Sequence, residues 1–477
     1  MTTVRKIAEW LLALSLAGLA LLTVWLSLQA IRIPYQVVYA EGMNLYAGLR
    51  MAQGISPYPD PRQWPIVLDT YGPVTYLAIA IPVKLFGVGF TAPRLVEVLA
   101  GIAVSVLLAL LIRHYTGQWA AAVAFGALFL CVPPISLWIV TLRVDLLAVA
   151  LALAGLLLFV ASPRFWYLAV LCWVAVIYCK WTMVAAPAAC VLWLLSRKQG
   201  RKAARLAGLT ALLTLVLFGA MEWWSRGHFA FHMFRTHPDP YSFLVYLEQL
   251  RRALFRLHAA SIGTAIFFLI VLRKHDFSLP AAYIPLALLG AATVGKFGSD
   301  TNHMLEATAA LCLGGGLGWA ALSKLAAGHK AAQAALAVAA LAVAALVFGN
   351  YRFVHYRQDG CLQAYRYVRA LPGGLALAED VGAVVLAGKT PAITDPWIYS
   401  QLVRRAGWTD SLLREKLRQR AVDYVILGDP ESRDLERWTL PVLGAIQQNY
   451  HPVARFDCVA ASVVYAPNQQ LEKGGAR

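Results

Sequence analysis

Charged residues are scarce in this sequence. Asp, Glu, Lys and Arg make up only 14% of its 477 residues, whereas hydrophobic residues make up 60%. Soluble domains carry about 25% charged residues, so a soluble globular fold is excluded. The composition is that of a chain that crosses a membrane several times.

Cysteine is also scarce, and internal repeats are absent. The seven cysteines include no CxxC pair, which argues against metal–thiolate chemistry. Cys361 and Cys458 lie in the polar C-terminal part of the chain, where they either form a disulfide or remain two free thiols. No repeat of fixed period is found.

Basic residues outnumber acidic ones, and the formal net charge is +17. Lys and Arg occur in short runs between apolar segments and form no continuous basic face interleaved with aromatics, so the sequence predicts no nucleic-acid partner. Basic loops of membrane proteins tend to stay in the cytoplasm. The segments predicted to be cytoplasmic contain Arg113, Arg164, the run 197–205, Arg273 with Lys274, and Lys324 with Lys330.

Apolar runs of membrane-helix length recur along the chain. A membrane helix needs roughly 20 apolar residues, and on this scale the sequence predicts about eleven spans. Their predicted bounds are Ile7–Ala30, Ala92–Ile112, Trp119–Ile139, Asp145–Ala161, Phe165–Cys179, Thr182–Leu195, Ala204–Trp224, Leu254–Leu272, Leu279–Val294, Met304–Leu322 and Ala331–Phe348. The stretch 165–195 is predicted to form two short helices that meet at Lys180 and leave room for a cavity.

The remaining segments complete the predicted fold class. Two amphipathic stretches, Gly42–Gln53 and Val74–Phe86, are predicted to lie at the membrane interface. We expect an all-α polytopic membrane domain over residues 1–350 and a small α/β domain over residues 351–477, outside the cytoplasm. In the tail, the predicted strands are Leu375–Ala378, Asp423–Leu427 and Ala454–Tyr465, and the predicted helices are Ile398–Ala406 and Ser411–Arg420.

Acidic residues beside apolar segments are candidate functional groups because an ionisable side chain is costly there. Glu41 opens the first amphipathic stretch and could take a proton from a hydroxyl acceptor, or it could stabilise a helix N-terminus. Asp145 stands at the entrance of a span, where it is either functional or a helix cap. Asp69 ranks third among the candidate acids.

The candidate phosphate-binding groups are the cations Arg143 and Lys180 and the polar loop that begins at Lys296. Arg143 and Lys180 could hold a lipid phosphate, or they could simply anchor at the headgroups. The loop 296–303 is dense in polar groups that suit phosphate or hydroxyl ligands, the alternative being a solvated turn. The candidate binding residues are Tyr71, Arg143, Lys180, Lys296, Asp300, Asn302 and His303.

The sequence names no certain cofactor. A divalent metal is left open, because Asp300, His303 and Glu306 together offer oxygen and imidazole ligands. Such spacing is common by chance.

The order of these features resembles the GT-C superfamily, specifically the bacterial relatives of protein O-mannosyltransferases and of the lipid A aminoarabinose transferase. The resemblance covers about residues 7–322. It rests on a first span followed by a long outer loop that begins with an acid, and then on the segments Gly54–Tyr58, Tyr71–Pro73, Lys84–Gly87, Ala92–Leu95, Arg143–Asp145 and Gly298–Asn302.

This resemblance implies a glycosyltransferase of the cell envelope, a hexosyl- or pentosyltransferase, and one candidate base with no evident protein nucleophile favours inversion. The enzyme would move a sugar from a polyprenyl-phosphate donor to a hydroxyl of a glycan, lipid or protein acceptor. The family also implies an essential acid in the first outer loop, where relatives commonly have Asp-Glu and this chain has Ala40-Glu41. Glu41 is therefore the predicted general base, with Asp145 as the alternative.

Two other classes of function fit a polytopic membrane protein. A transporter or lipid flippase would use Asp145, Lys180 and Lys296 as substrate or ion sites, but such proteins usually show internal repeats and matched broken helices. A non-catalytic scaffold that displays the tail would not need dense polar loops. The sequence therefore favours the enzyme.

Overall fold

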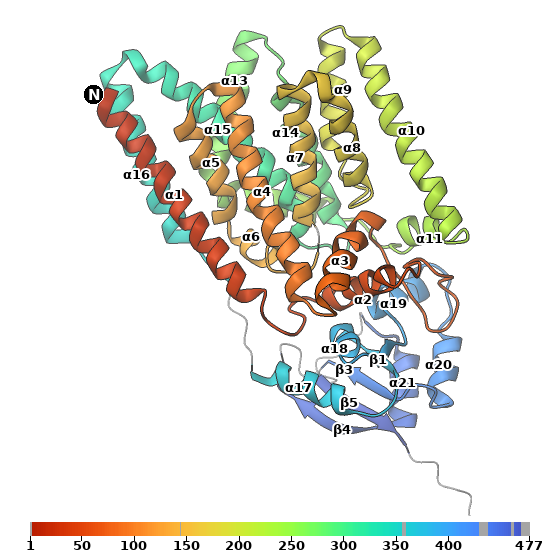
Figure 1. Cartoon of the computed structure of the whole chain (residues 1–477). Helices are drawn as coiled ribbons and strands as arrows, with labels where there is room; N and C mark the ends of the chain where they lie inside the picture. Colours follow the sequence, from red (N-terminus) through yellow and green to blue (C-terminus); the bar gives the residue numbers. More distant parts are fainter. Residues whose placement is uncertain (1, 144, 355–358, 429–436, 459–461, 469–477) are drawn as a thin grey trace, which may run out of the picture.

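The computed structural model describes residues 2–143, 145–354, 359–428, 437–458 and 462–468. A bundle of apolar helices occupies most of the molecule, and a small α/β domain covers one end of it (Figure 1). The protein is a polytopic membrane protein in which the predicted tail domain lies against the loops of the bundle.

Every predicted span overlaps a helix, although the bounds of several differ. The helices of the bundle are α1 (Thr2–Ala30), α4 (Thr91–Thr116), α5 (Trp119–Cys131), α7 (Asp145–Ala161), α8 (Trp166–Ile177), α9 (Ala185–Ser196), α10 (Gly200–Trp224), α13 (His258–Lys274), α14 (Leu279–Gly290), α15 (Leu305–Leu325) and α16 (Lys330–Asn350). The prediction for 119–139 needs a correction. The helix ends at Cys131, since Pro133 and Pro134 lack an N–H and start the separate helix α6 (Pro133–Trp138).

The lengths of these helices differ widely. Within the described residues, five helices are long and apolar enough to cross a membrane alone, or six if the bent pair of α12 (Phe243–Arg256) and α13 counts as one. Other apolar helices are shorter, among them α8 and α9, which flank Lys180 as predicted. The number of spans therefore stays a prediction.

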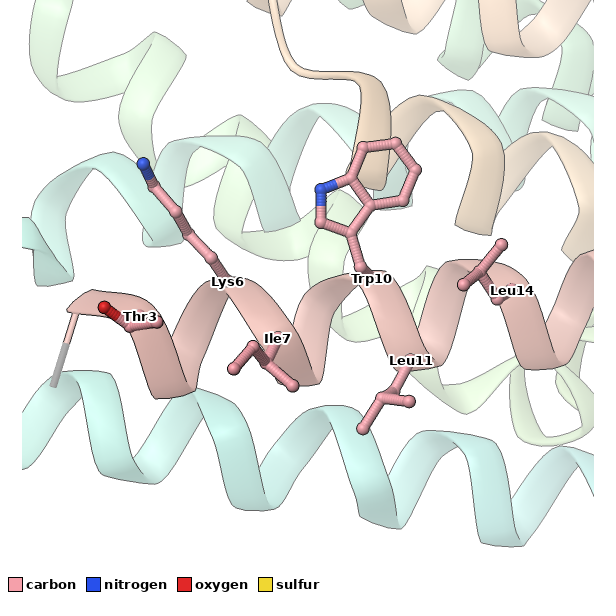
Figure 2. Close-up of a pocket in the computed structure, with 6 residues that line it drawn as sticks. All are labelled: Thr3, Lys6, Ile7, Trp10, Leu11 and Leu14. Carbon is pink, nitrogen blue, oxygen red and sulfur yellow. The ribbon is translucent and has the colours of Figure 1, made fainter.

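The open face of α1 has the character of a lipid-facing surface. Figure 2 shows six of its side chains, four of them large and apolar. Trp10 is 44% exposed and Leu14 is 62% exposed, although both belong to a strongly apolar helix. Contact of such apolar surface with acyl chains is more favourable than its exposure to water.

Short helices fill the space between the bundle and the tail. The predicted amphipathic stretches are α2 (Glu41–Ala52) and α3 (Pro73–Phe86), and both lie at the tail end of the bundle (Figure 1). Another short helix is α11 (Phe229–Phe234). Elsewhere in the bundle, 3₁₀ turns follow or precede the long helices: η1 (Pro163–Phe165), η2 (Ala291–Gly295), η3 (Thr301–Met304) and η4 (Ala326–Gly328).

The tail is an α/β domain, as the composition change after residue 350 predicts. Its described sheet has the order β2-β1-β3-β5-β4, with β1 parallel to β2 and β3, and β5 antiparallel to β3 and β4. Its elements are α17 (Asp359–Ala370), β1 (Leu375–Ala378), α18 (Val381–Leu386), β2 (Thr390–Pro391), α19 (Pro396–Arg405), α20 (Ser411–Arg418), β3 (Tyr424–Leu427), α21 (Leu440–Asn449), β4 (Tyr450–Phe456) and β5 (Ser462–Pro467).

One tail prediction was wrong. The segment 454–465, predicted as one strand, belongs to two antiparallel strands, β4 and β5, and residues 459–461 between them lie outside the described residues. The alternating apolar pattern is the same in one long strand and in a hairpin, so periodicity alone does not separate them.

The loop between α2 and α3 joins the tail by backbone pairing. Ile66 donates its N–H to the Ala392 carbonyl at 2.9 Å and accepts from the Thr394 N–H at 3.1 Å, next to strand β2. Ile66 and Leu68 are buried in a core that otherwise consists mainly of tail residues. The loop therefore extends the tail sheet and fixes the tail against the bundle.

Cys361 and Cys458 form a disulfide that ties α17 to the end of β4. We expect non-reducing peptide mapping by mass spectrometry to recover one cross-linked peptide containing both residues. We also expect Cys361→Ser to lower the free energy of unfolding of the tail by about 2–5 kcal/mol. Two freely alkylated thiols in the native protein would contradict the assignment.

Candidate functional site

A cavity of about 380 Å³ lies between the bundle and the tail. Its walls come from the start of α2, the loop 68–71, the turn 179–182, the loop 237–239, the loop between α14 and α15, and the tail near α19. Ligand pockets in proteins are typically about 300–1,000 Å³, so the space suits a small ligand group.

Two cations on the bundle side of the cavity share one carboxylate. Lys180 Nζ lies 2.6 Å from Asp145 Oδ1, and Arg143 Nε lies 3.8 Å from Asp145 Oδ2. Asn302 Nδ2 donates to both carboxylate oxygens at 3.1 Å. Lys180 and Arg143 line the cavity, whereas Asp145 and Asn302 lie behind them and are not among its lining residues. Asp145 thus holds the two cations at the cavity wall.

Aromatic rings fix the Arg143 guanidinium. Its Cζ lies 5.8 Å from the Tyr71 ring centroid and 5.5 Å from that of Trp138, a cation–π geometry. Arg143 Nε is buried and has no hydrogen-bond partner among the described residues. Burial also raises the pKa of Tyr71 to about 12, so its hydroxyl stays a donor at neutral pH.

The loop between α14 and α15 adds a third cation, Lys296, and the imidazole of His303 to the cavity wall. His303 Nδ1 lies 2.8 Å from Thr293 Oγ1. Asp300 does not join them: it is exposed, caps η3 by accepting from the Thr301 N–H, and is not a lining residue. The prediction of Asp300 as a binding residue is therefore revised.

The same loop offers no metal site in the described part of the chain. No three His, Cys, Asp or Glu side chains there are placed to hold a metal ion. Glu306 instead accepts from the Tyr283 hydroxyl at 3.4 Å, away from the Asp300 cap.

The structure places Glu41 outside the cavity. Its side chain is fully buried and is paired with Arg94 through two hydrogen bonds of 2.7 and 2.8 Å. It also accepts from the backbone N–H of Leu142 at 2.8 Å and from those of Val37 and Val38. A carboxylate with this many donors is neither free to take a proton nor in reach of a ligand, so the prediction of Glu41 as general base is corrected to a structural role.

Arg94 and Glu41 together form a structural hub, because Arg94 also bonds two backbone carbonyls. Besides Glu41, its guanidinium donates to the carbonyls of Ile33 and Tyr35, each at 2.7 Å. The hub connects the end of α1, the start of α2, α4 and the segment before Arg143. Through the Leu142 N–H, it fixes the backbone that presents Arg143 to the cavity.

The tail contributes lining residues that the sequence alone did not reveal. Asp395 accepts from the Tyr39 hydroxyl at 3.2 Å and from the Ile398 N–H at 2.9 Å. Trp397 stacks on Phe297 with ring centroids 6.1 Å apart. Asp395 before Pro396 is a recognisable helix N-cap signal, but no sequence signal connects it with a loop more than 300 residues away.

A second tail contact closes the same wall. Arg437 lies over the Tyr39 ring at 4.7 Å and donates to Glu379 at 2.8 Å. Gly298 has a φ of +78°, and a Cβ there would overlap the Trp397 ring, so only glycine lets the loop approach the tail this closely. The tail therefore covers the outer side of the cavity.

Known proteins have a similar sequence over part of the chain and a similar fold over nearly all of it. A family model described as dolichyl-phosphate-mannose-protein mannosyltransferase matches residues 70–224. The structure of ArnT from Cupriavidus metallidurans bound to undecaprenyl phosphate is similar with a TM-score of 0.62 and 13% identity, over 97% of this chain and 98% of that chain. The chain has the fold of the GT-C superfamily.

Other comparisons agree on this fold. The archaeal oligosaccharyltransferase AglB from Archaeoglobus fulgidus, in complex with an inhibitory peptide and a dolichol-phosphate, is similar with a TM-score of 0.58 and 12% identity, over 98% of this chain and 74% of that chain. A search of curated proteins finds no match. At these identities the comparisons define the GT-C fold, and the chemistry has to be argued from the cavity.

Proposed function

We propose that this protein is a glycosyltransferase that moves a sugar from a polyprenyl-phosphate donor to a hydroxyl acceptor in the cavity beneath the tail. The proposal rests mainly on Arg143 and Lys180, two cations held at the cavity wall by one carboxylate, Asp145. Lys296 adds a third positive charge to the same wall. Such a cluster suits a phosphate, which becomes more negative as the sugar leaves it.

The bond changes of the proposed reaction are simple. The acceptor oxygen attacks the anomeric carbon while the bond from that carbon to the phosphate oxygen breaks. The phosphate keeps the electron pair, and its charge is held by Arg143, Lys180 and Lys296. A cavity base receives the acceptor proton. A single displacement of this kind inverts the anomeric centre, and the sugar is a hexose or a pentose.

The comparisons support the donor class. The similar ArnT structure holds undecaprenyl phosphate, and the similar AglB structure holds a dolichol-phosphate together with a peptide. We propose a polyprenyl-phosphate donor for this chain as well, because its cavity has a cationic wall and lies at the end of the apolar bundle. We assign donor binding to residues 1–350, and coverage of the acceptor side to residues 351–477, with a glycan, lipid or protein as acceptor.

The proposed location is the outer face of the inner membrane, with a cytoplasmic N-terminus. Basic residues occur in the last turn of α4 and in the turn between α9 and α10, and both places lie at the end of the bundle opposite the tail (Figure 1). We expect alkaline phosphatase fused after Tyr351 to be active and a fluorescent reporter that matures only in the cytoplasm to be dark there. The reverse pattern would invert the proposed topology.

A transfer assay tests the proposed function. Purified protein in nanodiscs is incubated with a panel of radiolabelled polyprenyl-phosphate sugars and a membrane extract that supplies glycan, lipid and protein acceptors. We expect label to leave at least one donor and appear in a product, with release of polyprenyl phosphate. Vesicles that translocate a labelled donor without cleaving it would instead indicate a flippase.

A further inference from the structure

The start of α2, where the sequence predicts the general base, presents no carboxylate to the cavity. Ala40 lines the cavity, whereas the neighbouring Glu41 is buried in its ion pair with Arg94. The residue that faces the ligand at this point therefore carries only a methyl group. If the proposed transfer occurs, the acceptor proton has to go to another group on the cavity wall.

Asp69 is a buried acid of the cavity wall. It lines the cavity and is only 3% exposed. Its Oδ2 is buried and has no hydrogen-bond partner among the described residues. A buried carboxylate without a partner is costly, by several kcal/mol for an isolated charge, so its retention at a cavity wall points to a ligand.

We propose that Asp69 is the general base of this enzyme and accepts the proton of the acceptor hydroxyl. The inference rests on the proposed function and adds a catalytic residue to it. The acceptor O–H bond breaks, the oxygen forms the bond to the anomeric carbon, and the proton moves to a carboxylate oxygen of Asp69. The donor phosphate leaves with the electron pair, so no further reactant is needed.

Two side chains, His232 and Thr394, hold the backbone around Asp69. Burial lowers the pKa of His232 to about 4, so its ring is neutral; one ring nitrogen accepts from the Asp69 N–H at 3.2 Å, and the other donates to the Pro59 carbonyl at 2.9 Å. The adjacent Leu68 N–H donates to Thr394 Oγ1 of the tail at 2.7 Å. A base held this firmly needs little reorganisation during the reaction.

The electrostatic surroundings suit a base. Burial raises the pKa of the Asp69 carboxyl well above its ordinary value; Arg50 of α2 opposes this shift and Asp395 of the tail adds to it. Burial raises the pKa of the neighbouring Tyr58 and Tyr76 hydroxyls, and Asp69 adds to both shifts. A raised pKa makes the ionised carboxylate a stronger base, and the ionised form is the one that accepts the acceptor proton.

The rival acids are engaged elsewhere. Asp145 is neutralised by Lys180 and bonded to Asn302, and Asp395 caps α19 and bonds Tyr39. Asp239 also lines the cavity and has one oxygen without a partner, but its other oxygen lies 3.4 Å from His237 Nδ1. That pair is the main competitor, because an aspartate can orient a histidine base.

The test compares Asp69→Asn with Asp60→Asn, a matched change in the same loop that does not touch the cavity. We expect Asp69→Asn to lower transfer by about 10²–10⁴-fold while polyprenyl-phosphate binding is retained. Thermal unfolding should shift to the same or a higher temperature, since the change removes an unpaired buried charge. Asp60→Asn should match the wild type in all three measurements.

A second variant covers the case in which Asp69→Asn does not fold. Asp69→Ala is assayed with added formate, a small diffusible base, and we expect formate to restore part of the transfer rate; a residue with a structural role alone would show no rescue. Near wild-type transfer by Asp69→Asn, or absent rescue combined with loss of transfer in Asp239→Asn, would overturn the proposal. If the wild type moves no sugar from any donor, the proposed function itself fails.

Discussion

Lys180→Ala is expected to lower sugar transfer by about 10²–10³-fold, the usual cost of removing one charge-stabilising donor from a reaction centre. Lys180 is 11% exposed, lines the cavity and forms its closest contact with Asp145. Its loss removes positive charge where the departing phosphate develops negative charge, and it leaves Asp145 without its nearest cation. Both effects disfavour phosphate binding.

The measurement is donor affinity together with turnover, in the same nanodiscs. Lys84→Ala is the matched control, because Lys84 is an exposed lysine at the end of α3 that does not line the cavity. We expect Lys84→Ala to be indistinguishable from the wild type. If Lys180→Ala binds and processes donor normally, the phosphate is held elsewhere and the role assigned to the cation cluster is wrong.

Glu41→Gln is expected to destabilise the fold by about 3–5 kcal/mol, the typical cost of removing one partner of a buried ion pair. Both side chains of the Glu41–Arg94 pair are 0% exposed, and the substitution leaves the Arg94 charge without its partner. The expected result is a lower unfolding temperature and less folded protein after gel filtration in detergent. Any loss of transfer should scale with the loss of folded protein.

A double-mutant cycle with Arg94→Met is the control for this prediction. Removing both charges avoids an unpaired buried charge, so the double variant should be less destabilised than the sum of the two single variants. A Glu41→Gln protein that is as stable as the wild type, but transfers sugar at least about 10²-fold more slowly, would return Glu41 to the role of base.

Much of the fold could be predicted from hydrophobic patterning. The amphipathic stretches 42–53 and 74–86 match α2 and α3 within a residue at each end, and the strand Leu375–Ala378 matches β1. These elements are set by local periodicity and by Pro and Gly at their ends, which are visible in sequence. The pairing of two short helices at Lys180 was also predicted from length alone.

The cations of the site could be predicted for a related reason. Arg143, Lys180 and Lys296 are isolated charges beside apolar segments, and such charges are rarely placed there without a role. Asp145, the carboxylate shared by Arg143 and Lys180, was predicted as a member of the site but as an alternative base. Its contacts with Lys180 and Asn302 instead identify it as the residue that positions the cations.

The choice of acid could not be made from sequence because it depends on distant partners. Glu41 and Asp69 are both acids of the first outer loop, and only the contact with Arg94, 53 residues away, separates a saturated carboxylate from an unpartnered one. The tail wall raises the same difficulty. Asp395, Trp397 and Arg437 line the cavity in a fold in which the loop at Ile66 pairs with the tail sheet, a long-range contact that local sequence does not reveal.

A structure of the protein in nanodiscs with undecaprenyl phosphate tests the proposed phosphate site most directly. We predict phosphate density in the cavity beneath the tail, in contact with Arg143, Lys180 and Lys296, and with the prenyl chain leading toward the apolar bundle. Density for the phosphate at any other place, or an empty cavity at saturating lipid, would contradict the proposed donor site.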